Sequence, residues 1–346
     1  AADWNRFTQA GFLCSLTHPQ GSVCVRFSLA VRSTVNLVRP WCLLPISFLS
    51  LPVEFVRMMH AIFRRISQTP SGLSASMISR RFSNASGSLV RSELVPADDG
   101  GASDVYTVTM SKAPVNSLDL AMVKALHNEL LELEDKGATG ILLKSDAKVF
   151  SAGIDLGEFY KAKKPQLLSF WGEFEALWHT LYMSPMATVA ALESHAIAGG
   201  CILAMACDYR VMAKNEKLKI GLNESVLGMV PPRWLQAMTK ETVGTRNAEI
   251  LLQTGSLVNP QTALDFGLVD ELVETDQVQS RAAELLGTYT CVPRNARADT
   301  KAQSRGHVAA LAGPGSCREL WNCLKGKEAD DSLTKVVEGL NAKKKN

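Results

Sequence analysis

Apolar and polar residues follow two different periods along the middle of this chain. Short apolar runs of strand length lie at residues 105–110, 140–145, 186–192, 209–213 and 217–221. Between these runs, apolar residues recur every three or four positions, as they do along one side of a helix. The helical stretches are 116–134, 167–183 and 200–207. This alternation predicts right-handed βαβ units that build a mainly parallel sheet.

The pattern becomes predominantly helical after Trp234. Residues 248–252 lead to Gly255, and Asn259-Pro260 is typical of a helix start that continues to residue 265. A short extended piece over 268–273 follows. Further helices are predicted over 277–286, 300–311 and 316–340, with a solvated lysine tail at 343–345. A sheet-rich core followed by a helical C-terminal part is therefore expected.

The charge is unevenly distributed between the start of the chain and the rest. The formal net charge is +3, but residues 1–82 carry nine arginines, no lysine and two acidic residues. The remainder holds 28 Lys and Arg against 32 Asp and Glu, a balance of −4. The basic character thus belongs to the first segment, which removes the main reason to expect a nucleic-acid partner.

The first 92 residues are predicted to precede the folded core. Residues 58–91 contain five arginines and many serines but no acid, which is typical of a mitochondrial transit peptide, and Arg80-Arg81-Phe82-Ser83 suggests cleavage after Phe82. A disordered basic tail is the alternative. The apolar stretch 41–53 is short for a membrane span and holds two prolines. The expected division is a disordered upstream extension over 1–57, a transit peptide over 58–92, a core over 93–275 and a helical part over 276–346.

The eight cysteines suggest neither a metal site nor a disulfide framework. No C-x-x-C pair occurs, and no histidine pair lies near the cysteines. Free thiols in a reducing compartment are the simpler interpretation. We therefore expect no metal.

Two glycine-containing runs are candidates for binding a reacting carbonyl group. Residues 150–156 read FSAGIDL, and residues 198–201 read AGGC at the start of an apolar helix. Small residues allow a ligand to approach the backbone, and a helix start presents unpaired N–H groups that favour a developing oxyanion. One donor from each run would form an oxyanion hole. The alternative is that both runs serve only in turns and close packing.

Glu224 is the candidate acid or base. It stands in an apolar, turn-rich segment, 220–232. A carboxyl group among such neighbours loses hydration, which raises its pKa and makes it a better base near neutral pH. The residues alone leave open that it is a surface loop glutamate or an acid at a helix N-terminus near Ser225.

In combination these motifs resemble the crotonase (enoyl-CoA hydratase/isomerase) superfamily. The resemblance rests on the runs 150–156 and 198–201, and on Cys207-Asp208-Tyr209-Arg210. The run IGLNE at 220–224, followed by Leu227-Gly228, is similar to the mitochondrial Δ3,Δ2-enoyl-CoA isomerases of that superfamily. The resemblance to the superfamily covers residues 103–275 well. It implies an α/β fold whose spiral core is built of stacked ββα units, with a helical C-terminal part.

The resemblance also implies roles for single residues. The N–H groups of Ala152 and Gly199 would hold the thioester oxygen, and Glu224 would be the catalytic acid/base. The residues expected to line the CoA-thioester site are Ala152, Gly153, Ile154, Asp155, Leu156 and Gly199. Hydratases of the superfamily carry a second glutamate three residues after the oxyanion glycine. Here that position is Ile202.

The activity implied is isomerisation of a 3-enoyl-CoA to the 2-trans-enoyl-CoA used in fatty-acid β-oxidation. The substrate is an acyl-CoA thioester, no separate cofactor is needed, and family members form trimers or dimers of trimers. The mitochondrial matrix is the expected compartment; an end at Lys345-Asn346 lacks the peroxisomal S-K-L address. The alternatives are 2-enoyl-CoA hydration, other crotonase thioester chemistry, or a non-catalytic crotonase-like binding protein, for instance for RNA.

Overall fold

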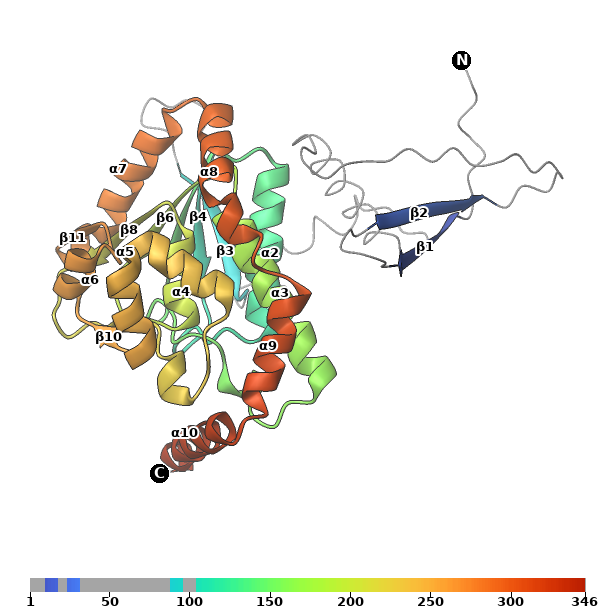
Figure 1. The fold of residues 1–346 in the computed structure, drawn as a ribbon. Helices are drawn as coiled ribbons and strands as arrows, with labels where there is room; N and C mark the ends of the chain where they lie inside the picture. The colour runs from blue at the N-terminus through green and yellow to red at the C-terminus, as the bar shows by residue number, and fades with distance from the viewer. Residues whose placement is uncertain (1–9, 18–23, 32–87, 96–103, 346) are drawn as a thin grey trace, which may run out of the picture. The chain divides into compact units, whose positions relative to one another are not determined.

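The computed structural model describes residues 10–17, 24–31, 88–95 and 104–345 (Figure 1). The chain divides into two compact units, Ala1–Arg81 and Phe82–Asn346. Most of the predicted transit peptide, the cleavage position after Phe82 and the apolar stretch 41–53 lie outside the described residues.

The first unit contains two antiparallel strands, β1 (Ala10–Thr17) and β2 (Cys24–Val31). Their pairing runs from Ala10 opposite Val31 to Thr17 opposite Cys24. Both stretches are rich in apolar and β-branched residues, which favour extended pairing. The disorder expected for residues 1–57 is therefore corrected at these two stretches, and the rest of that segment is outside the described residues.

A six-stranded sheet is the centre of the second unit, with strand order β11-β8-β6-β5-β4-β3. Its strands are β3 (Val90–Leu94), β4 (Val105–Met110), β5 (Gly140–Ser145), β6 (Ala187–Leu192), β8 (Tyr209–Ala213) and β11 (Glu271–Val273). Only the β3–β4 pair is antiparallel, and every other neighbouring pair is parallel. The prediction of a mainly parallel sheet is confirmed.

The sheet starts before residue 93, where the core was expected to begin. Strand β3 pairs with β4 from Val90 opposite Met110 to Leu94 opposite Tyr106. Val90 is 5% exposed and packs in the hydrophobic core. The predicted transit segment 58–92 therefore overlaps an edge strand of the fold at its last residues, because Val90 packs in the core and the strand pairs with β4.

A smaller three-stranded sheet, ordered β10-β9-β7, carries the chain into the candidate site. Its strands are β7 (Ala196–Ile197), β9 (Ile220–Gly221) and β10 (Leu257–Val258). Strand β7 runs parallel to β9 and leads directly into α4 (Gly199–Ala206), which is buried along its whole length. The candidate regions around Gly199 and Glu224 therefore follow neighbouring strands.

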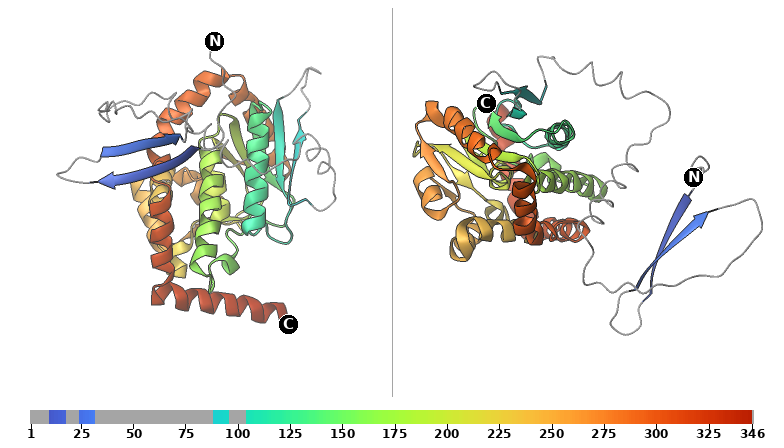
Figure 2. Two further views of the ribbon diagram at one scale, coloured as in Figure 1. Left: turned by 90° about the vertical axis from the view of Figure 1, so that its right-hand side faces the viewer. Right: turned by 90° about the horizontal axis from the view of Figure 1, so that it is seen from above.

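Helices α2 (Leu120–Asp135) and α3 (Lys164–Tyr182) pack beside each other, as Figure 2 shows. Helix α2 starts later than the predicted residue 116. Asp119 caps it by accepting a hydrogen bond from the Met122 N–H at 2.9 Å. Asn116 instead has a φ of 46°, and its side chain donates to the Phe150 carbonyl at 3.1 Å. Asn116 thus belongs to a buried turn.

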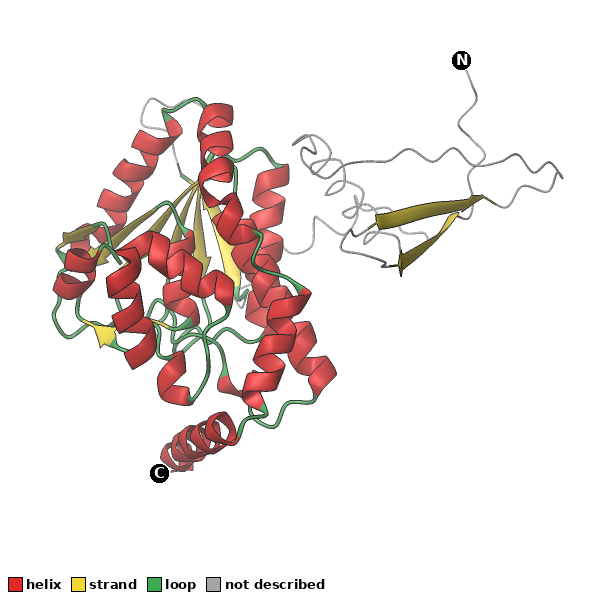
Figure 3. Cartoon of the chain, viewed as in Figure 1, coloured by secondary structure: helices red, strands yellow, loops and turns green. Residues whose placement is uncertain are grey.

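The C-terminal part is helical, as Figure 3 shows. Its helices are α5 (Arg233–Thr254), α6 (Pro260–Phe266), α7 (Val278–Thr290), α8 (Arg294–Ala309), α9 (Pro314–Leu324) and α10 (Lys327–Lys345). The single helix expected over 316–340 is two helices, because Gly326 ends the first and donates its N–H to the Cys323 carbonyl at 2.9 Å. Residues 343–345 continue α10 rather than form a separate tail.

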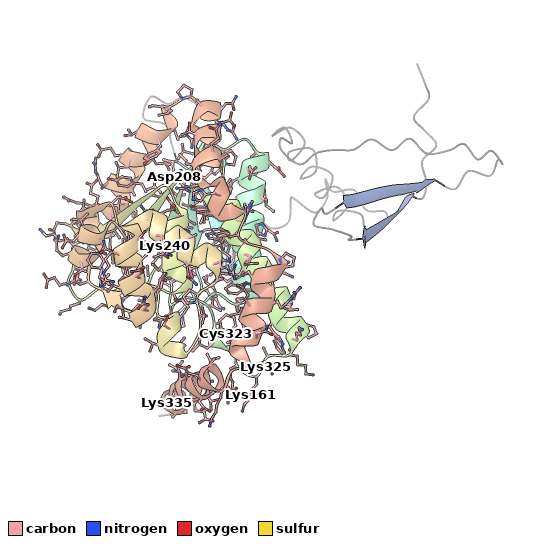
Figure 4. The ribbon with its side chains drawn as sticks, in the orientation of Figure 1. Lys161, Asp208, Lys240, Cys323, Lys325 and Lys335 are labelled. Atoms are coloured by element: carbon pink, nitrogen blue, oxygen red, sulfur yellow. The ribbon has the colours of Figure 1, made fainter. Side chains whose placement is uncertain are left out.

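Basic side chains of α8 fasten this helical part to the core at Asp208, which is labelled in Figure 4. Lys301 Nζ lies 2.6 Å from Asp208 Oδ2, and Arg305 Nη2 lies 3.1 Å from Asp208 Oδ1. Arg305 also donates to the carbonyls of Tyr182 and Ala206, at the ends of α3 and α4. Cations at helix C-termini are stabilised by the helix dipole. Among the described helices, none is long and apolar enough to cross a membrane.

Candidate active site

The two glycine-containing runs meet in space, as the sequence predicts. Ser151 pairs with Ala196 in a parallel bridge, and the Ile197 N–H donates to the Ser151 carbonyl at 3.0 Å. A Cβ built on Gly199 would lie 3.2 Å from the Ile154 nitrogen. The backbone around Ile154 and the start of α4 are therefore immediate neighbours.

The structure replaces Ala152 by Ile154 as the donor from the first run. The Ala152 N–H already donates to the Val115 carbonyl at 2.9 Å. Gly153 O and the Asp155 N–H both bond to Leu118, so in this extended stretch the Ile154 N–H points to the opposite side. The N–H of Ile154 has no acceptor among the residues that the structure describes. N–H groups alternate in direction along an extended backbone, so a prediction from sequence can select the wrong one. The free donor is Ile154, two residues after the predicted Ala152.

Gly199 offers the second unpaired donor. It is the first residue of α4, so its N–H has no acceptor within the helix. The preceding residue, Ala198, has φ 47° and ψ −115°, a corner conformation typical of glycine in type II′ turns. Hydrogen bonds hold it there: its N–H donates to Gly221 and its carbonyl accepts from Ile202. The prediction that Gly199 presents an unpaired N–H beside the first run agrees with this geometry.

Ala198→Gly is expected to raise the free energy of unfolding by about 1 kcal/mol, because glycine adopts this positive φ without a Cβ penalty. Urea denaturation would measure it. Ala204→Gly, inside α4, is the matched control and should destabilise the protein by a similar amount. A destabilised Ala198→Gly protein would contradict the strain inferred at this corner.

Glu224 begins the 3₁₀ helix η4 (Glu224–Leu227), which follows β9. Its carbonyl accepts the Met229 N–H at 3.0 Å, so the segment turns tightly. A Cβ on Gly255 would lie 3.1 Å from the Val226 nitrogen, which shows how closely the end of α5 packs against η4. Position 224 is therefore fixed by backbone contacts on both sides.

The Glu224 carboxyl is largely shielded from solvent, and one of its oxygen atoms lacks a partner. Its Oε2 atom is buried and has no hydrogen-bond partner among the described residues. Burial raises the pKa of Glu224 to about 7, partly opposed by the residue's own backbone N–H. The pKa of Cys201 in the first turn of α4 is raised by burial and then by the Glu224 charge. The alternative of a solvent-exposed loop glutamate is thus excluded by the structure.

Glu224 lines a cavity of about 150 Å³ whose walls are mostly apolar. Among the described residues that line it, Glu224 is the only carboxylate, and Asn223 beside it carries the other polar chain end. Ile202, where hydratases have a second glutamate, is part of the wall and 1% exposed. The lining residues are Ala152, Ile154, Leu156, Phe159, Trp171, Ala198, Ile202, Asn223, Glu224, Leu227, Met229, Val230, Pro231, Pro232, Leu235, Leu320 and Val336.

Three of the predicted substrate-binding residues, Gly153, Asp155 and Gly199, are not among the residues that line this cavity. Asp155 caps the short 3₁₀ helix η3 (Leu156–Glu158) by accepting from the Gly157 N–H at 2.9 Å. Gly153 lies against Ile197 and Gly199, where a Cβ would come within 2.8 Å of the Ile197 carbonyl. Both shape the site through the backbone, and their contact with substrate stays a prediction.

Sequence reasoning missed the contributions of the C-terminal helices. Leu320 of α9 and Val336 of α10 close one side of the cavity. Leu320 is 6% exposed and Val336 is 36% exposed, and the helical spacing predicted over 316–340 did not indicate what either side chain contacts. Trp171 of α3 also lines the cavity.

The described residues hold no group of three or more His, Cys, Asp or Glu side chains arranged for a metal ion. Five cysteines with described side chains are free thiols: Cys201, Cys207, Cys291, Cys317 and Cys323. Ser151 is buried and donates to the Asn116 carbonyl at 2.7 Å, so its hydroxyl serves the turn.

The family model described as enoyl-CoA hydratase/isomerase matches residues 100–312. The chain belongs to the enoyl-CoA hydratase/isomerase family. This match covers the six-stranded sheet from β4 onward, both glycine-containing runs and Glu224.

Several members of the enoyl-CoA hydratase/isomerase family are similar over most of the chain. Mitochondrial enoyl-CoA delta isomerase 1 from Mus musculus is 39% identical over 253 residues, 72% of this chain and 81% of that protein. The Homo sapiens protein of the same name is 40% identical over 214 residues, 61% of this chain and 70% of that protein. The crystal structure of human mitochondrial delta3-delta2-enoyl-CoA isomerase matches with a TM-score of 0.69 and 35% identity. That match covers 74% of this chain and 99% of the human chain.

A Bacillus halodurans enoyl-CoA hydratase structure matches with a TM-score of 0.63 and 23% identity, over 72% of this chain and all of that one. At that identity the likeness concerns the fold alone. Together these matches confirm the predicted fold class, an α/β crotonase-type core followed by helices.

Proposed function

We propose that this chain is a Δ3,Δ2-enoyl-CoA isomerase, which moves the 3-double bond of an enoyl-CoA to the 2-trans position. The observation that carries the proposal is a single carboxyl group, Glu224, in a mostly apolar cavity, with its Oε2 atom lacking a hydrogen-bond partner among the described residues. The backbone N–H groups of Ile154 and Gly199 likewise have no acceptor in the part of the chain that the structure describes. The names of the similar mitochondrial isomerases support the same reaction.

In the proposed mechanism, the Glu224 carboxylate removes a proton from C2 of the 3-enoyl thioester. The electrons of that C–H bond move toward the carbonyl and give a thioester enolate. The N–H groups of Ile154 and Gly199 hold the enolate oxygen, in a site from which water is excluded. Protonated Glu224 then returns the proton at C4, and the double bond forms between C2 and C3. One proton moves and no electron leaves the substrate, so we propose that no metal or redox cofactor takes part.

One carboxylate favours isomerisation over hydration. A hydratase must position and split a water molecule, which is the work of two carboxyl groups, whereas a proton shuttle needs one. Ile202 provides an apolar wall where the second carboxylate would stand.

The test is to incubate the purified protein with 3-cis- and 3-trans-enoyl-CoA and to follow the 2-trans product. Isomerisation is the expected result. Hydration of a 2-enoyl-CoA, or release of free CoA, in place of isomerisation would point to the other crotonase chemistries. Acyl-CoA binding without turnover would point to a binding protein.

The rate should depend on pH through Glu224, which acts as a base only when ionised. Because burial raises its pKa to about 7, kcat/KM is expected to fall about tenfold for each pH unit below that value and to level off above it. Initial rates in buffers of constant ionic strength would measure the profile. A flat profile down to about pH 5, near the ordinary glutamate range, would contradict the proposed desolvated base.

We further propose that the protein works in the mitochondrial matrix as a trimer or dimer of trimers. The similar isomerases are named mitochondrial, and the acid-free, arginine-containing stretch 58–91 supports import. Light scattering on the purified protein and fractionation of mitochondria test the assembly and the compartment. The absence of nucleic-acid binding stays an expectation, based on the −4 balance after residue 82.

A further inference from the structure

A second buried carboxylate, Glu175, lies outside the cavity and has no part in the mechanism above. It is on α3 and is 5% exposed. Its Oε1 atom accepts the Trp234 Nε1–H at 2.6 Å, and its Oε2 atom accepts the Cys317 thiol at 3.8 Å. Burial raises the pKa of Glu175, opposed by hydrogen bonds from neutral groups that include Ser316. A carboxylate held by uncharged donors is costly to bury, which calls for a reason.

The groups that bond to Glu175 are in contact with, or next in sequence to, residues that line the cavity. Trp171 lies one helical turn before Glu175 on α3 and lines the cavity. Its Nε1–H donates to Ser316 Oγ at 3.1 Å. Trp234 precedes the lining residue Leu235 on α5. The indole rings of Trp171 and Trp234 lie 6.3 Å apart, so one aromatic cluster connects Glu175 to the cavity.

Glu175 also reaches the beginning of α9. Ser316 and Cys317 belong to the first turn of α9 (Pro314–Leu324), and Leu320 one turn later lines the cavity. Helices α3 and α9 run side by side in both views of Figure 2. A carboxylate accepts several hydrogen bonds at once, so a single residue can fix groups from α5 and α9 against α3.

We propose that Glu175 is a positioning residue that holds Trp171 and the start of α9 against the apolar end of the cavity, and so limits the length of the acyl chain that enters. The proposal rests on the acyl-CoA substrate proposed above. In this proposal the acyl chain of the substrate contacts Trp171 and Leu320, and Glu175 acts by positioning these two residues. Without Glu175, Ser316 loses a partner and the Trp171 ring gains freedom to swing away from the cavity.

Glu175→Leu, which keeps a similar volume but accepts no hydrogen bond, is the first variant. Glu175→Gln retains an acceptor for Trp234 and is the conservative rescue. Glu173→Leu, on the same helix and facing away from the cavity, is the matched control. Calorimetric titration with hexanoyl-CoA and dodecanoyl-CoA measures binding without turnover, and kcat and KM are measured with 3-enoyl-CoAs of the same two lengths.

Glu175→Leu should shift the ratio of dodecanoyl- to hexanoyl-CoA affinity by about tenfold toward the longer chain, since a change of one methylene in an apolar pocket already has that effect. The shift should appear in KM while kcat and its pH profile stay as in the wild type. Glu175→Gln and Glu173→Leu should keep the wild-type ratio.

A folded Glu175→Leu protein with the wild-type ratio would overturn the proposal. If Glu175→Leu fails to fold, Trp234→Phe and Ser316→Ala remove single hydrogen bonds from the same network, and an unchanged ratio in both would overturn it equally. If the wild type isomerises 3-enoyl-CoA but the variants leave the ratio of dodecanoyl- to hexanoyl-CoA affinity unchanged, only the role of Glu175 is refuted. A wild type that binds acyl-CoA without isomerising it refutes only the proposed reaction, and no acyl-CoA binding refutes both.

Discussion

Glu224→Gln is expected to lower kcat for enoyl-CoA isomerisation by about 10³–10⁴-fold, the upper part of the range for a general acid/base. The amide keeps the size of the side chain but cannot take the C2 proton. Because the cavity offers no second carboxylate among its described lining residues, no neighbour can replace it. The KM should change little, since the substrate contacts remain. Stopped-flow measurement of 2-trans-enoyl-CoA formation would determine both constants.

The same variant should be more stable than the wild type at neutral and alkaline pH. The folded state raises the pKa of Glu224 from 4.5 to about 7, so it binds the proton more tightly than the unfolded chain does. That stabilisation is complete below the unfolded pKa and is lost as the pH rises through the folded value. At about pH 8 the ionised carboxyl therefore costs up to about 3 kcal/mol, which Glu224→Gln removes.

The control is Glu249→Gln, which changes an exposed carboxylate on α5. It should leave both turnover and unfolding unchanged. Wild-type turnover in Glu224→Gln would remove Glu224 from the reaction. Equal stability of Glu224→Gln and wild type at both pH 5 and about pH 8 would show that the carboxyl is not desolvated.

Much of the core could be predicted because its elements are local in sequence. The strands β4, β5 and β8 have the predicted bounds, since each is a short apolar run between turn residues. Helix limits were less accurate where side chains compete with the backbone. Asn116 extends a helical apolar pattern, yet its carboxamide is used in a buried turn, and the helix begins at Asp119.

The sequence indicated which residues form the site but not which of their backbone N–H groups point into it. The resemblance to the crotonase superfamily implies that Glu224, Gly199 and the run 150–156 share one site. The structure places Gly199 against Ile154, and Glu224 lines the same cavity as Ala152 and Ile154. Which N–H of the run is unpaired depends on the alternation of bond directions, and that was decided by the pairing of Gly153 and Asp155 with Leu118. Leu118 lies more than thirty positions earlier in the sequence, so no local pattern reveals the pairing.

The wall of the cavity formed by α9 and α10 depends on contacts between residues that are still farther apart in the sequence. Leu320 and Val336 meet Glu224's segment only because α9 and α10 fold back over it. In Figure 4, Cys323 marks the end of α9, and its sulfur accepts the Val230 N–H at 3.3 Å. Helical spacing predicted an apolar face for residues 316–340 but could not show that Gly326 divides it into two helices.

Gly200→Ala is expected to lower the free energy of unfolding by about 3 kcal/mol or more, because overpacking against backbone leaves no room for relaxation. A Cβ at this position would lie 2.7 Å from the Ser151 carbonyl oxygen and 2.8 Å from Ser151 Cβ. Either α4 or the run 150–156 must move, and both carry the proposed oxyanion donors. Turnover should therefore fall as well, by about 10²-fold if one donor is displaced.

Gly172→Ala is the matched control, since a Cβ there meets nothing within 4 Å and the residue lies inside α3. Alanine at an exposed helical position should stabilise the protein by about 0.5–1 kcal/mol, with turnover unchanged. Urea unfolding and the isomerase assay on both variants measure the contrast. A Gly200→Ala protein as stable and active as the wild type would mean that the two glycine-containing runs are not in contact, and the oxyanion site inferred from their contact would be lost with it.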